Sequence, residues 1–257
     1  MGYEHITVEL GQPFATITLN RAEKRNALAL AVMQELITAF HEAGESKALG
    51  VILAANGPVF SAGHDFADMA GADLVAMREL FATCTEMMTA IQQIPQPVIA
   101  RVHALATAAG CQLVASCDLA VAADSAGFAA PGGKGGLFCH TPMVAIARNV
   151  GRKRAFEMAF TGDIVDARTA AEWGFVNKTV PVAELDHAVT DLLGRACRGS
   201  TLSKAMGKQT LYAQLDLPQE QAYRYAVEMM AAASQTADAQ EGITAFLEKR
   251  KPKFTGH

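Results

Sequence analysis

Three segments rich in small residues carry the strongest candidates for chemistry in this chain. They are residues 59–66, residues 106–112 and the glycine-rich stretch 131–136, and they follow buried strands or border the starts of helices. Small residues let backbone N–H groups approach a ligand closely, and a helix N-terminus adds a partial positive charge. Two N–H groups from separate segments that converge on one carbonyl oxygen form an oxyanion hole. Spacing alone does not decide this, because small residues at strand ends also serve tight packing.

An alternation of strands and helices is expected to position these segments. Residues 6–10 and 15–19 alternate their side chains around Gly11-Gln12-Pro13, which predicts a β-hairpin. The rhythm that follows is typical of parallel strands joined by crossover helices, and so of an α/β fold. Buried strands are expected at 50–54, 98–102 and 119–123, with helices at 29–43, 72–93 and 108–115.

The second half of the chain is expected to be mostly helical. Residues 131–140 are expected to form a loop, because Pro131 and four glycines interrupt regular structure. Helices should follow from Thr141, with one short strand at 176–180, and no strand signal is found beyond Gly199. We therefore divide the chain into a core at 1–198 and a helical region at 199–257.

Composition narrows the possible functions. The chain has 257 residues, of which 51% are hydrophobic and 19% charged, with a net charge of −4. There is no basic field for nucleic acid, and the apolar runs are too short to span a membrane. The N-terminus lacks the pattern of a signal peptide, so we expect a cytoplasmic protein, or a mitochondrial matrix protein if this is a mature eukaryotic form. Five scattered cysteines without a CxxC pair predict neither a disulfide framework nor a metal site.

Several motifs identify a family resemblance that covers essentially the whole chain. They are Leu19-Asn20-Arg21 with Asn26-Ala27-Leu28, residues 60–65, residues 108–113 leading into Cys117-Asp118, and residues 245–252. In this order and spacing they resemble the enoyl-CoA hydratase/isomerase (crotonase) superfamily. Residues 128–142 resemble its divergent enoyl-CoA hydratase domain-containing branch. The resemblance implies a spiral of ββα units, a C-terminal helical region that builds homotrimers or hexamers, an acyl-CoA thioester as ligand, and no separate cofactor.

The resemblance also implies the donors of an oxyanion hole for the thioester carbonyl. They would be the backbone N–H groups of His64 and Ala109, with Gly63 and Gly110 beside them at the substrate. Such donors act most strongly on the charge that develops in a thioester enolate. The His64 side chain is not needed for this role, and we expect it to face solvent or the pocket wall.

The sequence departs from the hydratases of the family at both of their catalytic glutamates. Gln112 occupies the position of the first, and an amide can bind water but cannot accept a proton at neutral pH. Gly132 occupies the position of the second and has no side chain. Because the acid/base pair is missing, we do not expect efficient hydration of an enoyl thioester.

His140 is a candidate replacement, because other members of the superfamily place a working carboxylate about eight residues beyond the second glutamate position. A histidine there could act as an acid or base near neutral pH. The alternative is that His140 caps or packs at the start of the helix from Thr141. The neighbouring thiol of Cys139 is a weaker candidate, since a lone thiol beside apolar residues is usually packed.

For the CoA moiety, the resemblance implies Lys24 and Arg25 near the ribose and phosphates and the backbone of Ala62 and Asp65 near the adenine. Basic side chains suit the phosphates of a nucleotide. The last helix would lend two further residues, often to the ligand of a neighbouring subunit: Phe246 and Lys249. For Lys249 the alternative is a solvated helix end stabilised by the helix dipole.

Three hypotheses for function remain open from the sequence. The first is an enzyme that acts on an acyl-CoA without glutamate-driven hydration, for instance an isomerase or thioester hydrolase that uses His140. The second is a residual hydratase supported by the oxyanion hole and Gln112. The third is a non-catalytic protein that binds acyl-CoA or acts as a scaffold.

Overall fold

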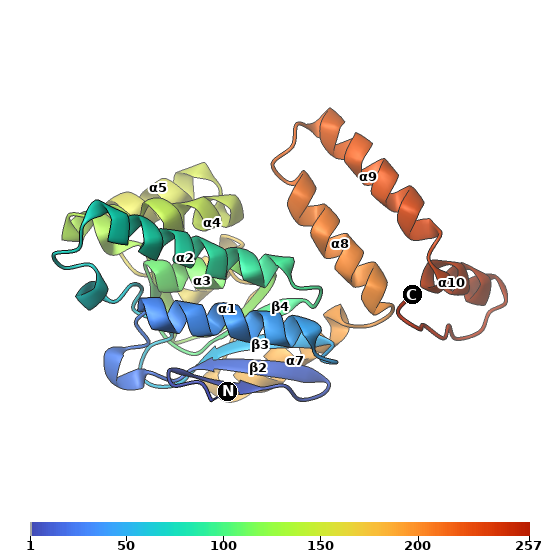
Figure 1. Cartoon of the computed structure of the whole chain (residues 1–257), viewed down its shortest axis with the longest axis horizontal. Helices are drawn as coiled ribbons and strands as arrows, with labels where there is room; N and C mark the ends of the chain where they lie inside the picture. Colours follow the sequence, from blue (N-terminus) through green and yellow to red (C-terminus); the bar gives the residue numbers. More distant parts are fainter. Residues whose placement is uncertain (1) are drawn as a thin grey trace.

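The computed structural model describes residues 2–257 and consists of an α/β core with a helical C-terminal region (Figure 1). The main sheet has the strand order β1-β2-β3-β4-β6-β9. Strands β1 (Ile6–Glu9) and β2 (Phe14–Leu19) form the expected antiparallel hairpin, and every later pairing in this sheet is parallel. The remaining strands are β3 (Gly50–Ala55), β4 (Val98–Val102), β6 (Leu119–Ala123) and β9 (Lys178–Val180).

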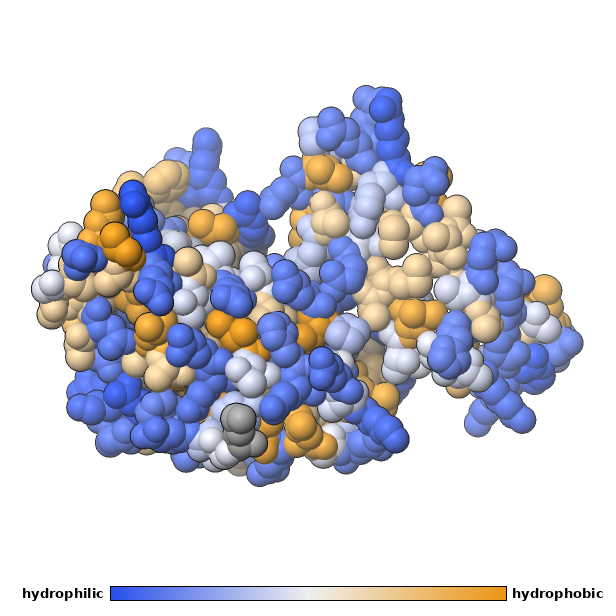
Figure 2. All heavy atoms as spheres, in the orientation of Figure 1, coloured by the Kyte–Doolittle hydropathy of each residue, from blue (hydrophilic) through white to orange (hydrophobic). Residues whose placement is uncertain are grey.

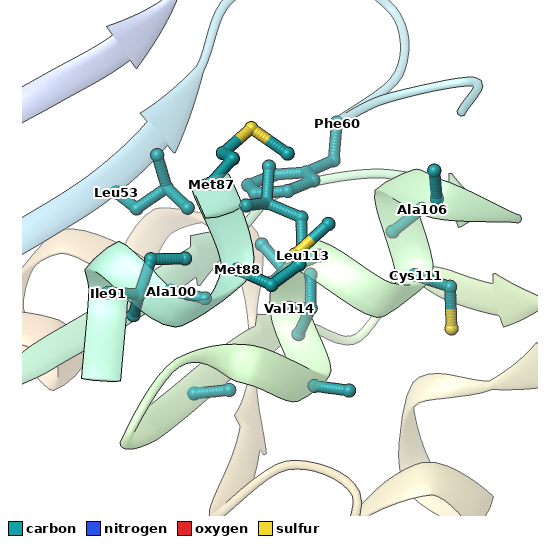
Figure 3. Packing of buried hydrophobic residues seen from close by; sticks show 14 of the residues in the cluster. Leu53, Phe60, Met87, Met88, Ile91, Ala100, Ala106, Cys111, Leu113 and Val114 are labelled. Atoms are coloured by element: carbon teal, nitrogen blue, oxygen red, sulfur yellow. The ribbon is translucent and has the colours of Figure 1, made fainter. Parts of the chain in front are cut away.

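The continuous apolar strands are explained by burial on both faces of this sheet. Val51, Ala100 and Ala122 face the larger core, whereas Ile99 and Val121 pack against α7 (Leu185–Ala196) on the other side. Helices α1 (Leu30–Glu45), α2 (Leu74–Gln93) and α3 (Ala109–Ser116) cover the first face. Figure 3 shows the centre of this core, where side chains of α2 and α3 meet those of the strands.

A second, three-stranded sheet contains β5 (Ala106–Thr107), β7 (Gly127–Ala129) and β8 (Val165–Asp166). None of these was predicted, because two or three residues are too few to show a period. The sheet is nevertheless important for the site, since β5 leads directly into α3. Three short 3-10 helices, η1 (Ala22–Lys24), η2 (Phe66–Asp68) and η4 (Val182–Glu184), complete the connections of the core.

The prediction of an irregular loop at 131–140 was wrong for Pro131–Gly135 and for His140, although residues 136–139 are irregular. Residues Pro131–Gly135 form a 3-10 helix (η3), because proline suits the first position of a helix and Gly136 ends it with a φ of 88°. The next helix, α4 (His140–Val150), begins one residue before the expected Thr141. It is followed by α5 (Arg152–Thr161) and α6 (Ala167–Glu172).

The C-terminal region, residues 201–257, projects from the core and is called the arm below (Figure 1). It contains α8 (Thr201–Gln214), α9 (Gln219–Ser234) and α10 (Ala237–Leu247). Neither α8 nor α9 has a fully buried residue, and large apolar side chains such as Met230, 77% exposed, lie on its surface. Within residues 2–257, no helix combines the length and apolar character needed to cross a membrane.

Candidate active site

The segments that carry His64 and Ala109 lie against each other. The chain after β3 runs beside β5, since the amide of Phe60 donates to the carbonyl of Leu105 at 2.9 Å and Thr107 donates to Ser61 at 3.0 Å. Gly63 adopts a φ of 86°, a conformation that glycine adopts without strain. A Cβ at Gly63 would lie 3.1 Å from the amide nitrogen of Ala109.

The amides of His64 and Ala109, called the amide pair below, are both free to bind a ligand. Neither donates a hydrogen bond to any other group within residues 2–257. Ala109 is the first residue of α3, so its N–H has no acceptor in its own helix. Ala109 thus offers an unpaired N–H at the N-terminus of α3, where the helix dipole favours negative charge, and the unpaired N–H of His64 lies on the neighbouring segment.

Gly110 makes this close approach possible. A Cβ at this position would lie 2.5 Å from the carbonyl oxygen of Ser61 and 2.8 Å from its Oγ. Ser61 is itself fully buried, and its hydroxyl donates to the carbonyl of Asn26 at 2.8 Å. The small residues at 110 and 63 therefore determine how closely α3 approaches the segment that carries His64.

His64 is half-buried, and both of its ring nitrogens are buried. Its ring packs edge-on against Phe81 of α2, with 5.4 Å between the ring centroids. Both ring nitrogens are buried without a hydrogen-bond partner in the described part of the chain. Burial lowers the pKa of His64, although the carbonyl of Leu28 and the carboxylate of Asp68 oppose this effect, and the imidazole is neutral at physiological pH.

Gln112 lies one turn into α3, where its backbone N–H donates to the carbonyl of Ala108 at 3.0 Å. The residue is only 5% exposed, and its side-chain oxygen has no partner among residues 2–257. The hydroxyl of Thr107 is also buried and unpaired. Buried polar atoms are usually hydrogen-bonded, so unpaired atoms on residues next to the amide pair are typical of a binding site.

Gly132 lies where the local chain leaves no room for a side chain. A Cβ there would lie 2.2 Å from the carbonyl oxygen of Leu137 and 2.7 Å from Sγ of Cys139. The segment is closed by two hydrogen bonds, from the amide of Leu137 to the carbonyl of Gly132 at 3.0 Å and from the amide of Gly132 to the Cys139 thiol at 3.3 Å. Burial raises the pKa of Cys139, although the amide of Gly132 opposes this effect, and a raised pKa disfavours the thiolate form.

His140 is exposed at the first position of α4 and does not cap the helix, because the N-cap residue is Cys139. Its ring packs against Phe138, with 5.1 Å between centroids, so the packing alternative describes its contacts. No hydrogen bond links its ring to the amide pair or to Gln112 within residues 2–257. Its role as an acid or base stays a hypothesis.

The segment that bears Lys24 and Arg25 lies beside residues 62–65. The amide of Ala62 donates to the carbonyl of Arg25 at 3.0 Å, and Arg21 forms an ion pair with Asp65 at 2.9 Å. The pKa of Asp65 is lowered mainly by the amide of Ala67 and further by Arg21. Four of the residues expected at the CoA moiety are therefore neighbours, and the side chains of Lys24 and Arg25 are exposed.

Sequence reasoning missed the residue that holds the segment with Lys24 and Arg25 in place. Asn26 is 1% exposed, and its side chain accepts from the amide of Arg21 at 3.0 Å and donates to the carbonyls of Asn56 at 2.7 Å and Val59 at 3.0 Å. Asn26 belongs to the motif that carried the family resemblance, but a single asparagine gives no indication of its partners. Phe81, which packs on His64, left no signal beyond the helical spacing of its neighbours.

The two residues expected from the last helix are not brought to the amide pair by the same chain. Phe246 is 82% exposed on α10, which packs against α8 and α9 and lies beside the start of α8 (Figure 1). Lys249 follows that helix with a φ of 55°. A contact of either residue with a ligand at the amide pair would have to be made in another copy of the chain.

Comparison with known proteins places the chain in one family. The family model described as enoyl-CoA hydratase/isomerase matches residues 9–257. A protein of Rattus norvegicus named enoyl-CoA hydratase domain-containing protein 3, mitochondrial, is 44% identical over 241 residues, which cover 93% of this chain and 80% of that protein.

Solved structures agree with this assignment. The crystal structure of human enoyl-CoA hydratase domain-containing protein 3 superposes with a TM-score of 0.93 at 42% identity and covers 97% of this chain and 100% of that one. The structure of an enoyl-CoA hydratase from Mycobacterium smegmatis gives a TM-score of 0.94 at 45% identity, with coverage of 97% and 98%. The chain thus has the crotonase fold, and it belongs to the enoyl-CoA hydratase/isomerase family.

Proposed function

We propose that this protein binds an acyl-CoA thioester and stabilises the enolate form of its acyl group, without efficient hydration of enoyl thioesters. The observation that carries the proposal is the amide pair, His64 and Ala109, whose two N–H groups are unpaired and held together by the packing at Gly63. An enolate concentrates negative charge on the former carbonyl oxygen, so these donors bind it more tightly than the ground state. The exposed Lys24 and Arg25 suit the phosphates of CoA.

The chemistry expected at the rest of the site is not that of a water-adding acid/base pair. Gln112 can orient a water molecule through its amide but cannot take its proton. A glutamate at position 132 would bring its Cβ within 2.2 Å of the backbone oxygen of Leu137, which supports the proposal that no carboxylate acts from this position. The alternative to simple binding is a reaction that uses His140, such as isomerisation or thioester hydrolysis.

We also propose that the protein self-associates as a homotrimer or a pair of trimers. The support comes from the arm, because α8 and α9 bury no residue fully within one chain and leave apolar side chains exposed. Exposed apolar surface of this extent is typical of an interface. The exposed apolar residues of these two helices include Leu211, Tyr223, Val227 and Met230. A monomer in sedimentation velocity at micromolar concentration would contradict this proposal.

The test is a panel of acyl-CoA thioesters that is incubated with the wild-type chain and with His140→Ala and analysed by mass spectrometry. We expect calorimetry to detect binding of acyl-CoA, and we expect crotonyl-CoA to be hydrated far below the ordinary enzymatic range of about 1 to 1,000 per second. Hydration within that range would overturn the proposal for the chemistry. Absence of acyl-CoA binding would overturn the whole proposal. Binding without turnover of any thioester would overturn catalysis and support a non-catalytic acyl-CoA-binding protein.

A second variant tests the interpretation of position 132. Gly132→Glu is expected to lower the free energy of unfolding by about 2 kcal/mol or more, because a Cβ at 2.2 Å from a backbone oxygen forces the segment apart. It should not produce hydration, even when combined with Gln112→Glu. A stable double variant that hydrates crotonyl-CoA would show that the segment can open around a glutamate.

A further inference from the structure

The arm is attached to the core of its own chain mainly through polar contacts. Helix α8 has no fully buried residue, and an open hollow of about 540 Å³ lies between it and the core. Figure 2 shows the notch that separates the core from the arm. Since hydrophobic packing is scarce here, specific polar contacts must determine how α8 is placed.

Lys208 of α8 provides the central contact. Its ammonium group lies 2.8 Å from Oδ2 of Asp118, and it donates to the carbonyl oxygens of Ile91 and Gln96, each at 2.8 Å. The side chain is only 8% exposed. All three N–H donors of the ammonium are used, so the lysine is fully satisfied only when α8 is docked.

Asp118 connects this lysine to the end of α3. It comes two residues after α3 ends at Ser116 and accepts hydrogen bonds from the amide of Val98 and from the hydroxyl of Tyr212, both at 2.7 Å. A single carboxylate therefore joins α8, the start of β4 and the C-terminal end of α3. Removal of one partner would leave a buried charge unpaired, which is far more costly than the loss of a surface ion pair.

Helix α4 is tied to the same place. Asn149 donates to the carbonyl of Ala115 in α3 at 3.0 Å, and Arg148 forms an exposed ion pair with Asp216 of the arm at 3.2 Å. Helices α3 and α4 thus contact the arm at their C-terminal ends. Their N-terminal ends carry Ala109 and His140.

The geometry points to Lys208 as a positioning residue for the amide pair, which acts by fixing the C-terminal end of α3 when the arm docks. Helix α3 has eight residues and is about 12 Å long, so it transmits a displacement of its far end to Ala109 as a rigid body. Gly110 packs too closely on Ser61 to absorb such a shift locally. The effect on ligands rests on the proposed function, whereas the coupling between arm and α3 does not.

The test compares the full-length wild type with Lys208→Met and with Tyr212→Phe, a milder change that removes one hydrogen bond and keeps the ion pair. Hydrogen exchange with mass spectrometry reports on α8 and on residues 108–112. If hydrogen exchange in these segments proceeds through undocking of the arm, it should be about 100-fold faster in both segments of Lys208→Met than in the wild type. For Tyr212→Phe it should be about tenfold faster. Arg224→Met, which breaks an exposed ion pair with Glu220 on α9, is the matched control and should leave both segments unchanged.

A ligand measurement separates this inference from the proposed function. Lys208→Met should weaken the binding of an acyl-CoA thioester about tenfold, while the binding of the thioether analogue, which lacks the carbonyl oxygen, changes little. Faster exchange in α8 with unchanged exchange at 108–112 would overturn the coupling. If the wild type does not prefer the thioester, the proposed function fails, and the exchange data still decide whether Lys208 positions α3. If Lys208→Met does not fold, Tyr212→Phe alone makes the decision.

Discussion

Substitution of Gly110 by alanine tests the amide pair most directly. The added methyl group would lie 2.5 Å from the carbonyl oxygen of Ser61, whereas ordinary van der Waals contact begins near 3.4 Å. Helix α3 and the segment that carries His64 must therefore separate by about 1 Å. Overpacking of this kind costs about 1–3 kcal/mol of stability, which a protein of this size tolerates while it remains folded.

The functional effect can be worked out from the two hydrogen bonds that the pair would make. Each contributes about 0.5–1.5 kcal/mol, so together they should favour an acyl-CoA thioester over its thioether analogue by about 5- to 150-fold. A separation of about 1 Å prevents both donors from reaching one oxygen. Calorimetric titration of Gly110→Ala with the two ligands should therefore show nearly equal affinities, because the thioester alone becomes weaker.

Gly207 provides the matched control, since it lies inside α8 and a Cβ there meets no atom within 4 Å. Gly207→Ala should keep the thioester preference of the wild type and raise the free energy of unfolding by about 0.5–1 kcal/mol. If Gly110→Ala is folded and keeps the full preference, the amide pair does not bind the carbonyl oxygen and the reasoning fails.

Two further predictions concern the neighbours of the pair. Ala108 has a φ of 52° and a ψ of −120°, which is strained for any residue with a side chain, so Ala108→Gly should raise the free energy of unfolding in urea by about 1 kcal/mol; an unchanged or lower value would contradict this. His64 has a pKa in the folded state below its unfolded value of 6.5, so below pH 6.5 the unfolded chain binds more protons at this residue than the folded chain does. The neutral ring therefore costs no stability above pH 6.5, and the free energy of unfolding decreases as the pH falls below that value. The urea midpoint of His64→Leu should fall less than that of the wild type between pH 7.5 and pH 5.5, and equal decreases would show that the His64 ring is accessible to protons in the folded state.

Much of the fold could be predicted because its signals are local. The runs at 50–54, 98–102 and 119–123 are apolar apart from Arg101, and all three form parallel strands of the main sheet. The helical spacing of residues such as Leu36 and Phe40 correctly indicated the buried face of α1. The division of the chain at residue 199 stays a prediction.

Other features depend on contacts between distant segments and have no local signal. The ring of His64 is buried because Phe81 of α2 covers it, and neither residue type indicates the other. Likewise, Lys208 looks like an ordinary surface lysine in the sequence, yet it is buried by the carbonyl groups at the end of α2 and by Asp118. Segment 131–135 was assigned to a loop because Pro131 and the glycines were read as interrupting regular structure, although a proline also suits the first turn of a helix.

The surroundings of Gly132 bear on the proposal that this site lacks the second carboxylate of a hydratase. If only the glutamate had been lost, an open space would remain into which a carboxylate could be restored. Instead, the carbonyl of Leu137 and the thiol of Cys139 occupy the space beside Gly132, and two hydrogen bonds hold them there. The local structure therefore leaves no room for a side chain at position 132, while His64 and Ala109 have unpaired amides and Gly63 and Gly110 pack closely. If the proposed function is correct, unpaired donors without a carboxylate at positions 112 and 132 would suit reactions in which the acyl-CoA itself supplies the charge, and not activation of water by a glutamate at either position.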